Sequence, residues 1–369
     1  MKVLMTADTV GGVWNYSLQL ADALAPYDVE VHLATMGAPL TLAQRTEALD
    51  IANLTVHEST YKLEWMDDPW ADVAAAGEWL LGLARDIRPD LVHLNGYAHG
   101  ALPWQVPVLV VGHSCSLSWW EAVRGEPAPP AWDCYRSEVS QGLHAANMVV
   151  APSGAMLAVL ERHYGTLTNP TVIYNGRDAS LFPPSAKEPL VLTVGRLWDE
   201  GKNVAALRDA ATGLAWPGYV GGEEQHPEGG RVSLGDLQPL GRLSAAQLAD
   251  WYGRAAVYAL PARYEPFGLS ALEAGLAGCA LVLGDIPSLR EIWGDAALFV
   301  PPNDTATLRL ALDALIENPP LRAEMAQRAR RRAMGYSVGR MVQGYITAYN
   351  ALCSGEVAAG WKEDIACIS

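Results

Sequence analysis

The chain lacks several features that would place it in a special class of protein. None of the apolar runs in its 369 residues approaches the roughly 20 residues that a membrane-spanning helix needs. The five cysteines are odd in number and show no C-x-x-C spacing, which argues against a disulfide framework or a zinc site and favours reduced thiols. The N-terminal stretch MKVLMTADTV has an apolar segment too short for a secretory signal. We therefore expect a cytoplasmic protein.

Positive charge is also scarce, particularly in the first half of the chain. The net charge is -15, and residues 1–150 carry seven Lys or Arg against eighteen Asp or Glu, with no local basic cluster. A surface of this kind repels both a nucleic-acid backbone and an anionic membrane face. We expect no nucleic-acid partner and no strong membrane association. The ligands should be neutral or small.

The length and the hydrophobic pattern predict two α/β domains. A chain of 369 residues exceeds what one core normally supports, and half of its residues are hydrophobic. Short Val/Leu-rich runs alternate with amphipathic helical stretches, as in a parallel sheet covered by helices. The expected strands of the first half are 2–7, 29–35, 90–94, 106–111 and 148–151.

The alternation starts again after the Pro-containing segment LFPPSAKEP, with a further strand expected at 190–195. We therefore predict an N-terminal domain over 1–183 and a C-terminal domain over 184–345. A helical tail over 346–369 is expected to pack back on the first domain. Doubly wound sheets bind ligands at the carboxyl ends of their strands, so the ligand should lie between two facing Rossmann-like domains.

The stretch YEPFGLSALEAG places two carboxylates around an expected helix start. Glu265 follows a strand-like run, Gly268 lies near the first turn of the helix, and Glu273 lies in the second turn. Helix N-termini offer unpaired N–H groups and a positive dipole end, which suit an anion or sugar hydroxyls. A carboxylate such as Glu273 can accept two hydrogen bonds from a vicinal diol. The alternative is that Glu265 only caps the helix and Glu273 faces solvent.

The stretch TVGRLWDEGKN places two cations after the expected strand 190–195. Arg196 and Lys202 would lie at the ligand-binding edge of the sheet and could converge on a diphosphate there. The alternative is that both are surface cations paired with Asp199 and Glu200.

Two further stretches follow strands of the first half. Gly11 and Gly12, in TADTVGGVWN, precede the first expected helix and would allow a backbone cradle for phosphate or sugar. The spacing is not G-x-G-x-x-G, so a nicotinamide dinucleotide fingerprint is absent. In VLVVGHSC, His113 follows another strand on the same side of the sheet. It is one of eight histidines, and a structural role is the alternative.

These stretches, in this order, resemble the family 4 glycosyltransferases, which are retaining enzymes of the GT-B fold. The resemblance spans nearly the whole chain, and its most specific part is the family's E-x7-E signature, matched by Glu265 and Glu273. GRLWDEGKN, ALFVPPND and VIYNGRDASLF (172–182) are also similar to the family.

The resemblance implies a role for each matching position. Glu265 and the backbone at Phe267, Gly268 and Leu269 would hold the donor sugar, and Glu273 would bind the nucleotide ribose. Arg196, Lys202 and the backbone at Gly12 would bind the diphosphate. His113 would approach the reacting sugar, and Arg242 and Leu243 would contact the base.

The activity implied is transfer of a hexose from a nucleotide diphosphate sugar to a hydroxyl group. UDP-glucose is the first choice of donor and GDP-mannose the second. Cationic side chains at the leaving phosphate would make a metal unnecessary, and no D-x-D motif is present; the pair Asp67-Asp68 falls in a loop-like stretch. Neither a cofactor nor a metal is expected. A sugar-nucleotide epimerase of the same fold and a non-catalytic nucleotide-sugar-binding protein remain as alternatives.

The acceptor is predicted from the distribution of tryptophan. Eight of the 13 tryptophans fall in the first 150 residues, and aromatic side chains suit stacking on a sugar or an aromatic aglycone. Trp119 and Trp120 closely follow His113 and are the best candidates for the acceptor wall. The plainer alternative is core or loop packing. We expect a soluble saccharide or another small molecule as acceptor.

Overall fold

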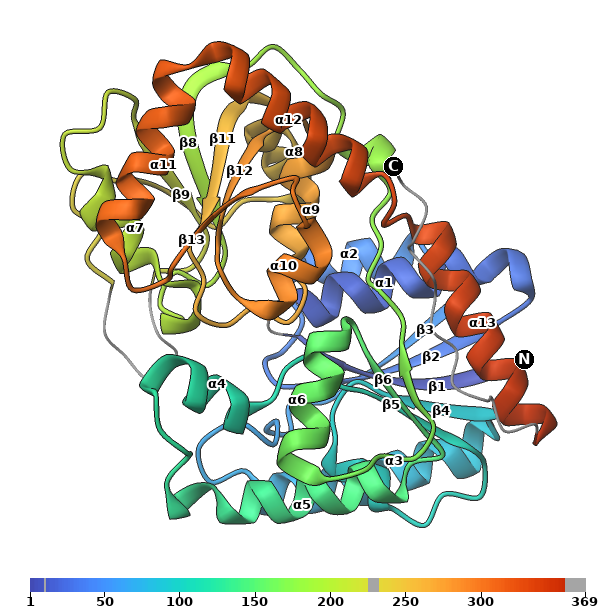
Figure 1. Cartoon of the computed structure of the whole chain (residues 1–369). Helices are drawn as coiled ribbons and strands as arrows, with labels where there is room; N and C mark the ends of the chain where they lie inside the picture. Colours follow the sequence, from blue (N-terminus) through green and yellow to red (C-terminus); the bar gives the residue numbers. More distant parts are fainter. Residues whose placement is uncertain (10, 225–231, 356–369) are drawn as a thin grey trace. The chain divides into compact units, whose positions relative to one another are not determined.

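The computed structural model describes residues 1–9, 11–224 and 232–355, which form two compact units (Figure 1). The first unit comprises Met1–Glu121, Glu126–Asn175 and, of the described residues that follow the second unit, 338–355. The second comprises Gly176–Ser337 together with the short segment Ala122–Gly125. No helix in these described ranges is both long enough and apolar enough to cross a membrane.

The first unit contains a seven-stranded, entirely parallel sheet in the order β3-β2-β1-β4-β5-β6-β7. Its strands are β1 (Lys2–Asp8), β2 (Glu30–Met36), β3 (Leu54–Glu58), β4 (Leu91–Leu94), β5 (Val108–Val111), β6 (Met148–Ala151) and β7 (Pro170–Val172). Its helices are α1 (Gly12–Leu24), α2 (Leu42–Leu49), α3 (Trp70–Ile87), α4 (Ser116–Arg124, whose last residues belong to the second unit), α5 (Asp133–Ala145), α6 (Gly154–Tyr164) and α13 (Val338–Ser354), with short 3-10 turns η1 (Ala25–Tyr27), η2 (Ala98–Ala101) and η3 (Pro130–Trp132).

The second unit repeats the plan with a six-stranded parallel sheet in the order β10-β9-β8-β11-β12-β13. Its strands are β8 (Glu188–Val194), β9 (Gly218–Gly221), β10 (Gln238–Gly241), β11 (Ala255–Leu260), β12 (Ala280–Gly284) and β13 (Leu298–Val300). Its helices are α7 (Val204–Ala211), α8 (Ala245–Arg254), α9 (Leu269–Leu276), α10 (Pro287–Trp293), α11 (Thr305–Glu317) and α12 (Pro319–Ala333), with 3-10 turns η4 (Ala179–Leu181) and η5 (Glu200–Lys202).

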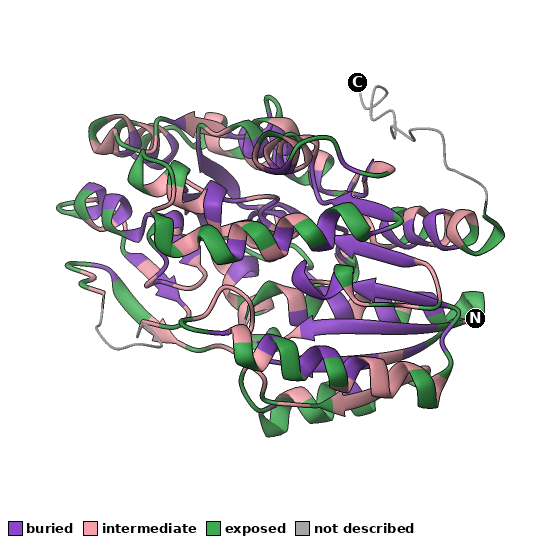
Figure 2. Cartoon of the chain, turned by 90° about the horizontal axis from the view of Figure 1, so that it is seen from below, coloured by how far each residue is buried: buried purple, intermediate pink, exposed green. Residues whose placement is uncertain are grey.

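Strand alternation distributes the core over the two faces of each sheet. In β1, Val3 and Met5 pack with α1 and α13 on one face, whereas Leu4 packs with the α3 and α5 side. The central strands are buried on both faces, which is the usual state of a parallel sheet (Figure 2). The two expected doubly wound parallel sheets are therefore confirmed.

The boundary between the units differs from the expected one at residue 183. The second unit begins at Gly176, because the backbone N–H of Arg177 donates to the carbonyl of Tyr336 at 3.0 Å and its guanidinium pairs with a carboxylate of α9. The chain returns to the first unit at Val338. There α13 buries Met341, Val342 and other side chains in the first core. Of the expected tail, residues 356–369 lie outside the described ranges.

Candidate functional site

The loops after β8 and β11 bring a lysine and a glutamate of the second unit together. Lys202, at the end of η5, forms an ion pair with Glu265, which lies between β11 and α9. Their side chains are only 19 % and 10 % exposed. The backbone explains the meeting, because the N–H groups of Arg263 and Tyr264 both donate to the carbonyl of Gly201, at 2.8 and 3.2 Å. The two loops are therefore hydrogen-bonded to each other.

Side chains within the first loop hold Lys202 in place. Asp199 is buried, and its Oδ1 accepts a hydrogen bond from the N–H of Gly201 at 2.9 Å. Asn203 takes a left-handed conformation and donates through Nδ2 to the carbonyls of Pro261 and Pro302, at 2.9 and 2.7 Å. The loop is thus fixed from both sides of Lys202, which lowers the entropy cost of presenting its ammonium group to a ligand.

Glu265 also acts at the helix start. The N–H of Gly268, the residue that caps α9, donates to Glu265 Oε1 at 3.0 Å. Gly268 has φ 93°, a conformation that strongly favours glycine. The first turn of α9 is tied to the end of β8 by Tyr258, whose hydroxyl donates to Ser270 Oγ at 2.7 Å and lies 3.3 Å from the carbonyl of Val194. Burial raises the pKa of Tyr258, so its hydroxyl remains a donor.

Glu273 is buried rather than solvent-facing. It pairs with Arg177 Nη2 at 2.7 Å, and the two side chains are only 11 % and 9 % exposed. Nearby, Tyr252 is buried, and burial together with the Glu273 carboxylate raises the pKa of its phenol. Sequence reasoning missed Arg177 as a partner, although it lies in the family-like segment VIYNGRDASLF. Nothing in the local sequence indicates that this arginine meets the second carboxylate of the E-x7-E motif.

The other expected residues of the second unit are placed as follows. Arg196 follows β8 and is 38 % exposed; it pairs with Asp199 at 3.0 Å, as the surface-cation alternative expected. Lys202 pairs with Glu265 and not with Glu200, so that alternative is wrong for the lysine. Phe267 is buried with its ring edge-on to Tyr336, and Leu269 begins α9. Arg242 and Leu243 follow β10 at the edge of the sheet, with Arg242 exposed.

In the first unit, the expected residues follow β1 and β5. Gly11 caps α1 with φ 99°, and Gly12 begins that helix, so the strand-turn-helix position is confirmed. His113 lies just after β5, and its Nε2 is 2.8 Å from Asn95 Oδ1. Burial lowers the pKa of His113 to about 3, so its imidazole is neutral at physiological pH. These glycines and the histidine therefore lie after strands of one parallel sheet.

Trp119 and Trp120 are on α4, half-buried, with their rings 6.2 Å apart in an edge-to-face arrangement. Trp120 also approaches Trp132, again with centroids 6.2 Å apart. Partial exposure leaves part of this aromatic cluster open to solvent. Its role as an acceptor wall stays a prediction.

The described ranges contain no group of three or more His, Cys, Asp or Glu side chains placed to hold a metal ion. The four cysteines in those ranges, Cys115, Cys134, Cys279 and Cys353, are free thiols, whereas Cys367 lies outside them.

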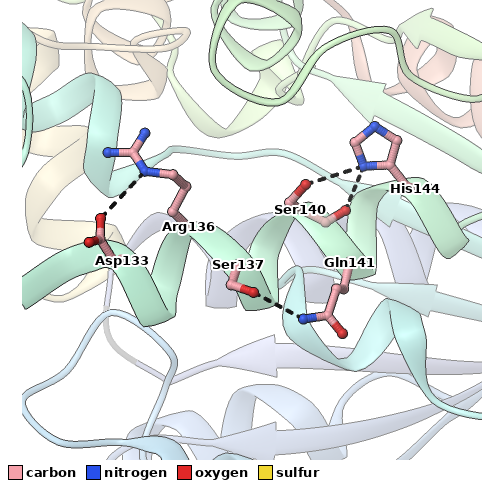
Figure 3. A pocket seen from close by; sticks show the side chains of 6 residues that line it. All are labelled: Asp133, Arg136, Ser137, Ser140, Gln141 and His144. Carbon is pink, nitrogen blue, oxygen red and sulfur yellow. Dashed lines mark hydrogen bonds and ion pairs between the residues drawn. The ribbon is translucent and has the colours of Figure 1, made fainter. Parts of the chain in front are cut away.

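A surface hollow on α5 has a polar lining but does not form a comparable site (Figure 3). Its polar groups pair within the helix: His144 Nδ1 donates to the carbonyl of Ser140 at 2.7 Å, and Gln141 Nε2 donates to Ser137 Oγ at 3.1 Å. The lining residues all come from this one helix: Asp133, Arg136, Ser137, Ser140, Gln141 and His144.

Comparison with known proteins identifies the family. The model of Glycosyltransferase Family 4 matches residues 10–181, and that of Glycosyl transferases group 1 matches residues 234–332. Glycogen synthase from Mycobacterium tuberculosis is 30 % identical over 289 residues, covering 68 % of this chain and 66 % of the relative. The chain belongs to the family 4 glycosyltransferases.

A further relative of this glycosyltransferase is the D-inositol 3-phosphate glycosyltransferase of Kineococcus radiotolerans, 29 % identical over 92 % of the chain and 90 % of the relative. Among solved structures, sucrose-phosphate synthase from Thermosynechococcus elongatus has a TM-score of 0.81 at 19 % identity, covering 96 % of this chain and all of that one. HepE from Anabaena, in complex with UDP-glucose, has a TM-score of 0.75 at 19 % identity, covering 95 % of this chain and all of that one. The glycosyltransferase therefore has the GT-B fold.

Proposed function

We propose that the protein is a retaining glycosyltransferase that moves a hexose from a nucleotide diphosphate sugar to a hydroxyl of a saccharide or small-molecule acceptor. The observation that carries the proposal is the pairing of Lys202 with Glu265 beside the N-terminus of α9. These groups suit a sugar diphosphate. The phosphate oxygens accept hydrogen bonds, as a cation and a helix N-terminus can provide, and the sugar hydroxyls can donate hydrogen bonds to a carboxylate.

The reaction depends on stabilising the leaving diphosphate. Negative charge grows on that group as its bond to the anomeric carbon breaks, so donors fixed beside it bind the transition state more strongly than the ground state. Lys202 would supply one fixed charge, and Arg196 would supply a second by turning from Asp199 to the diphosphate. Glu265 would accept hydrogen bonds from the sugar, and Glu273 from the ribose. This assignment requires no metal and no cofactor.

We propose UDP-glucose as the first donor to test. HepE, which shares the fold, was solved in complex with UDP-glucose. The names of the two relatives support a saccharide or a cyclitol phosphate as the acceptor class, since one is a glycogen synthase and the other acts on D-inositol 3-phosphate. A soluble acceptor and a cytoplasmic location stay predictions.

For the stereochemistry, we propose attack of the acceptor on the face from which the diphosphate departs, with the leaving phosphate taking the acceptor proton. Glycosidase carboxylates act in pairs on either side of the bond, whereas Glu273 is assigned to the ribose. Proton NMR of the first product formed should show the donor's anomeric configuration. An inverted product, or a glycosyl adduct trapped on a carboxylate, would contradict this proposal.

A panel of UDP-, GDP-, ADP- and dTDP-sugars tests the donor by thermal shift, since a ligand that binds the native state raises its melting temperature. Release of the nucleoside diphosphate is then measured with glucose, maltooligosaccharides and inositol phosphate as acceptors. Transfer should require an acceptor and should fall about 100-fold or more in Arg196→Ala. Donor conversion without any acceptor would indicate an epimerase. Donor binding with neither transfer nor slow hydrolysis would indicate a binding protein.

A further inference from the structure

Asn95 lies just after β4 and contacts two histidines of the first unit. Its Oδ1 is 2.8 Å from His113 Nε2 and 3.2 Å from His93 Nε2. Its Nδ2 donates to the carbonyl of Thr6 at 2.7 Å, and its backbone N–H donates to Thr6 Oγ1 at 2.9 Å. Asn95 is therefore anchored to β1 at two points, with its side-chain oxygen directed at both imidazoles.

These contacts determine which nitrogen of each histidine carries hydrogen. The carbonyl of Thr6 can only accept, so the amide group of Asn95 faces it and the amide oxygen faces the histidines. That oxygen also can only accept, so the Nε2 atoms of His113 and His93 are the protonated ones. The remaining nitrogen of His93, Nδ1, lies 2.6 Å from the hydroxyl of Tyr349 and accepts its hydrogen.

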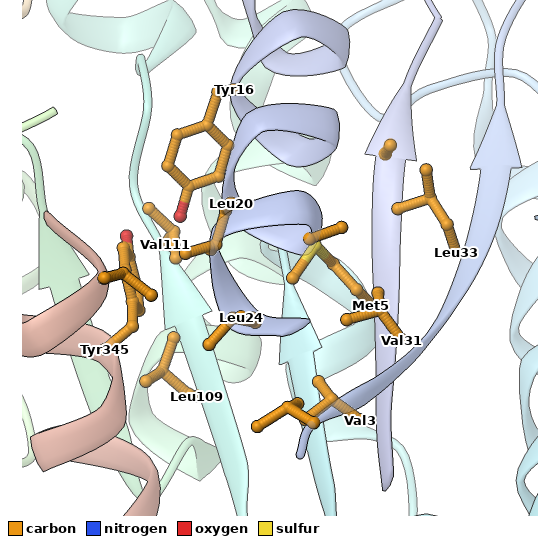
Figure 4. Packing of buried hydrophobic residues seen from close by; sticks show 14 of the residues in the cluster. Val3, Met5, Tyr16, Leu20, Leu24, Val31, Leu33, Leu109, Val111 and Tyr345 are labelled. Carbon is orange, nitrogen blue, oxygen red and sulfur yellow. The ribbon is translucent and has the colours of Figure 1, made fainter. Parts of the chain in front are cut away.

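The surroundings keep both imidazoles neutral. Burial lowers the pKa of His93 and of His113 to about 3. The other titratable groups against them are tyrosines of α1 and α13, and burial raises the pKa of each, so none is charged near neutrality. Figure 4 shows two of them, Tyr16 and Tyr345, beside Leu109 and Val111 of β5. The ring of Tyr16 meets His113 edge-on with centroids 4.5 Å apart.

A neutral imidazole has one N–H group, and that of His113 is used by Asn95. Its Nδ1 is left with a lone pair, and none of the residues in the described ranges hydrogen-bonds to it. Such a nitrogen accepts a hydrogen bond from a hydroxyl and repels a phosphate oxygen. With this tautomer, the free nitrogen of His113 can therefore bind a hydroxyl of a sugar nucleotide but not its phosphate oxygens.

We propose that Asn95 is a positioning residue that, with His93 and Tyr349 behind it, fixes His113 as a hydrogen-bond acceptor for a hydroxyl of the donor sugar. The inference rests on the proposed function for the identity of the ligand, but not for the tautomer. It gives the C-terminal helix α13 a part in the site, because Tyr349 completes the chain of hydrogen bonds that begins at His113.

The tautomer is tested first, in the full chain without ligand. The protein is labelled with 15N-histidine, and proton-nitrogen correlation spectra identify the protonated nitrogen of each ring; the signals of His113 and His93 are assigned by their loss in His113→Gln and His93→Gln. We expect both rings to be neutral and protonated at Nε2 from pH 6 to pH 8. An Nδ1–H tautomer or an imidazolium at His113 would overturn the inference even if the protein is a glycosyltransferase.

Kinetics then separate positioning from stability. Asn95→Leu should lower kcat/KM for the donor about 100-fold, because His113 loses its fixed orientation. Asn95→Asp keeps an acceptor but adds a charge that favours the imidazolium, so activity should gain a pH dependence between pH 6 and 8 that the wild type lacks. The matched control is Asn53→Leu, since Asn53 Nδ2 only braces the carbonyls of Ala21 and Val29, both at 2.8 Å.

The control should lower the melting temperature and leave the kinetic constants of the folded enzyme unchanged. Equal loss of activity in Asn53→Leu and Asn95→Leu, or a flat pH profile in Asn95→Asp, would overturn the positioning role. The hydroxyl is identified with deoxy analogues of the donor. With one of these analogues, the wild type should react more slowly than with the unmodified donor. His113→Ala should react with that analogue no more slowly than with the unmodified donor. If every analogue slows both proteins alike, His113 meets no sugar hydroxyl.

Discussion

Arg177 and Glu273 form an ion pair of 2.7 Å inside the second unit, with both side chains about one-tenth exposed. The arginine precedes β8 and the glutamate lies in α9, so the pair links the start of the unit to the helix at the candidate site. The two partners are strongly held together, because removing either one from a pair this deeply buried would leave the charge of the other uncompensated. The carboxylate expected at the ribose is therefore held in place before any ligand arrives.

Arg177→Met should lower the free energy of unfolding by about 3 to 5 kcal/mol, because Glu273 would remain as a buried charge without its partner. Urea unfolding measures the loss. The double variant Arg177→Met/Glu273→Leu should recover a large part of it. The control is Arg45→Met, which breaks the exposed pair of Arg45 with Glu58 and should cost much less stability than Arg177→Met. Equal losses of unfolding free energy in Arg177→Met and Arg45→Met would show that the buried pair stabilises the protein no more than the exposed pair does.

Lys202→Met should reduce sugar transfer about 100-fold or more, because a fixed charge at the leaving diphosphate is lost. Lys187→Met is the control, since Lys187 is another lysine of this unit whose ammonium group is hydrogen-bonded within the unit. Its Nζ donates to the carbonyls of Ala277 and Tyr252, at 2.8 and 3.0 Å, and so braces the ends of α9 and α8. It should lower stability and spare turnover per folded molecule. A Lys202→Met enzyme with wild-type turnover would contradict the assigned role.

Stability should decline as the pH falls below about 6.5, in part because of His93 and His113. Their pKa is near 6.5 in an unfolded chain and about 3 in the folded protein. Between pH 3 and pH 6.5 these histidines bind more protons in the unfolded state than in the folded state. The free energy of unfolding is therefore highest above pH 6.5 and falls as the pH is lowered toward 3. Each histidine contributes a slope of up to about 1.4 kcal/mol per pH unit. Burial also lowers the pKa of His99, which adds to the same trend.

Urea unfolding at several values between pH 4 and pH 7 checks this slope. His93→Gln should make it shallower by about the share of one histidine. Asn53→Leu removes no titratable group and should leave the slope unchanged. If His93→Gln and the wild type have the same slope, His93 is not the buried neutral group that the structure shows.

Gly142→Ala should be strongly destabilising, by about 3 kcal/mol or more, because α5 has no room for a side chain at this position. An added Cβ would lie 1.8 Å from the carbonyl oxygen of Tyr97, in the loop that follows Asn95. Gly82→Ala, in the middle of α3, is the control, since the nearest atom to its Cβ would be 3.8 Å away. That substitution should instead add about 0.5 to 1 kcal/mol of stability. Thermal unfolding of both variants tests the contrast.

The hydrophobic pattern of the sequence was sufficient for the central strands of both sheets. Strands buried on both faces appear as continuous apolar runs, as in β5 and β6, and these were predicted within a few residues. The pattern missed β3, which is only half-buried, and β7, which has three residues. It also missed β13, which has three residues, and β9 and β10, whose sequences GYVG and QPLG contain glycine or proline. β3, β7, β10 and β13 are edge strands, which bury fewer side chains and so carry a weaker signal. β9 is an inner strand, and its two glycines shorten the apolar run.

By itself the sequence determined what depends on near neighbours in the chain: the turn after β1, the loop that holds Glu265, the start of α9, and the place of Glu273 in its second turn. The tertiary structure alone decided the partners. Lys202 meets Glu265 because β8 and β11, which are distant in sequence, are neighbours in one sheet. Arg177 meets Glu273 where the backbone of Arg177 is hydrogen-bonded to Tyr336. Buried charged and amide groups need hydrogen-bonding or ionic partners, and these are whichever residues the fold brings close to them. The separation of two residues in the sequence does not give the distance between them in the fold.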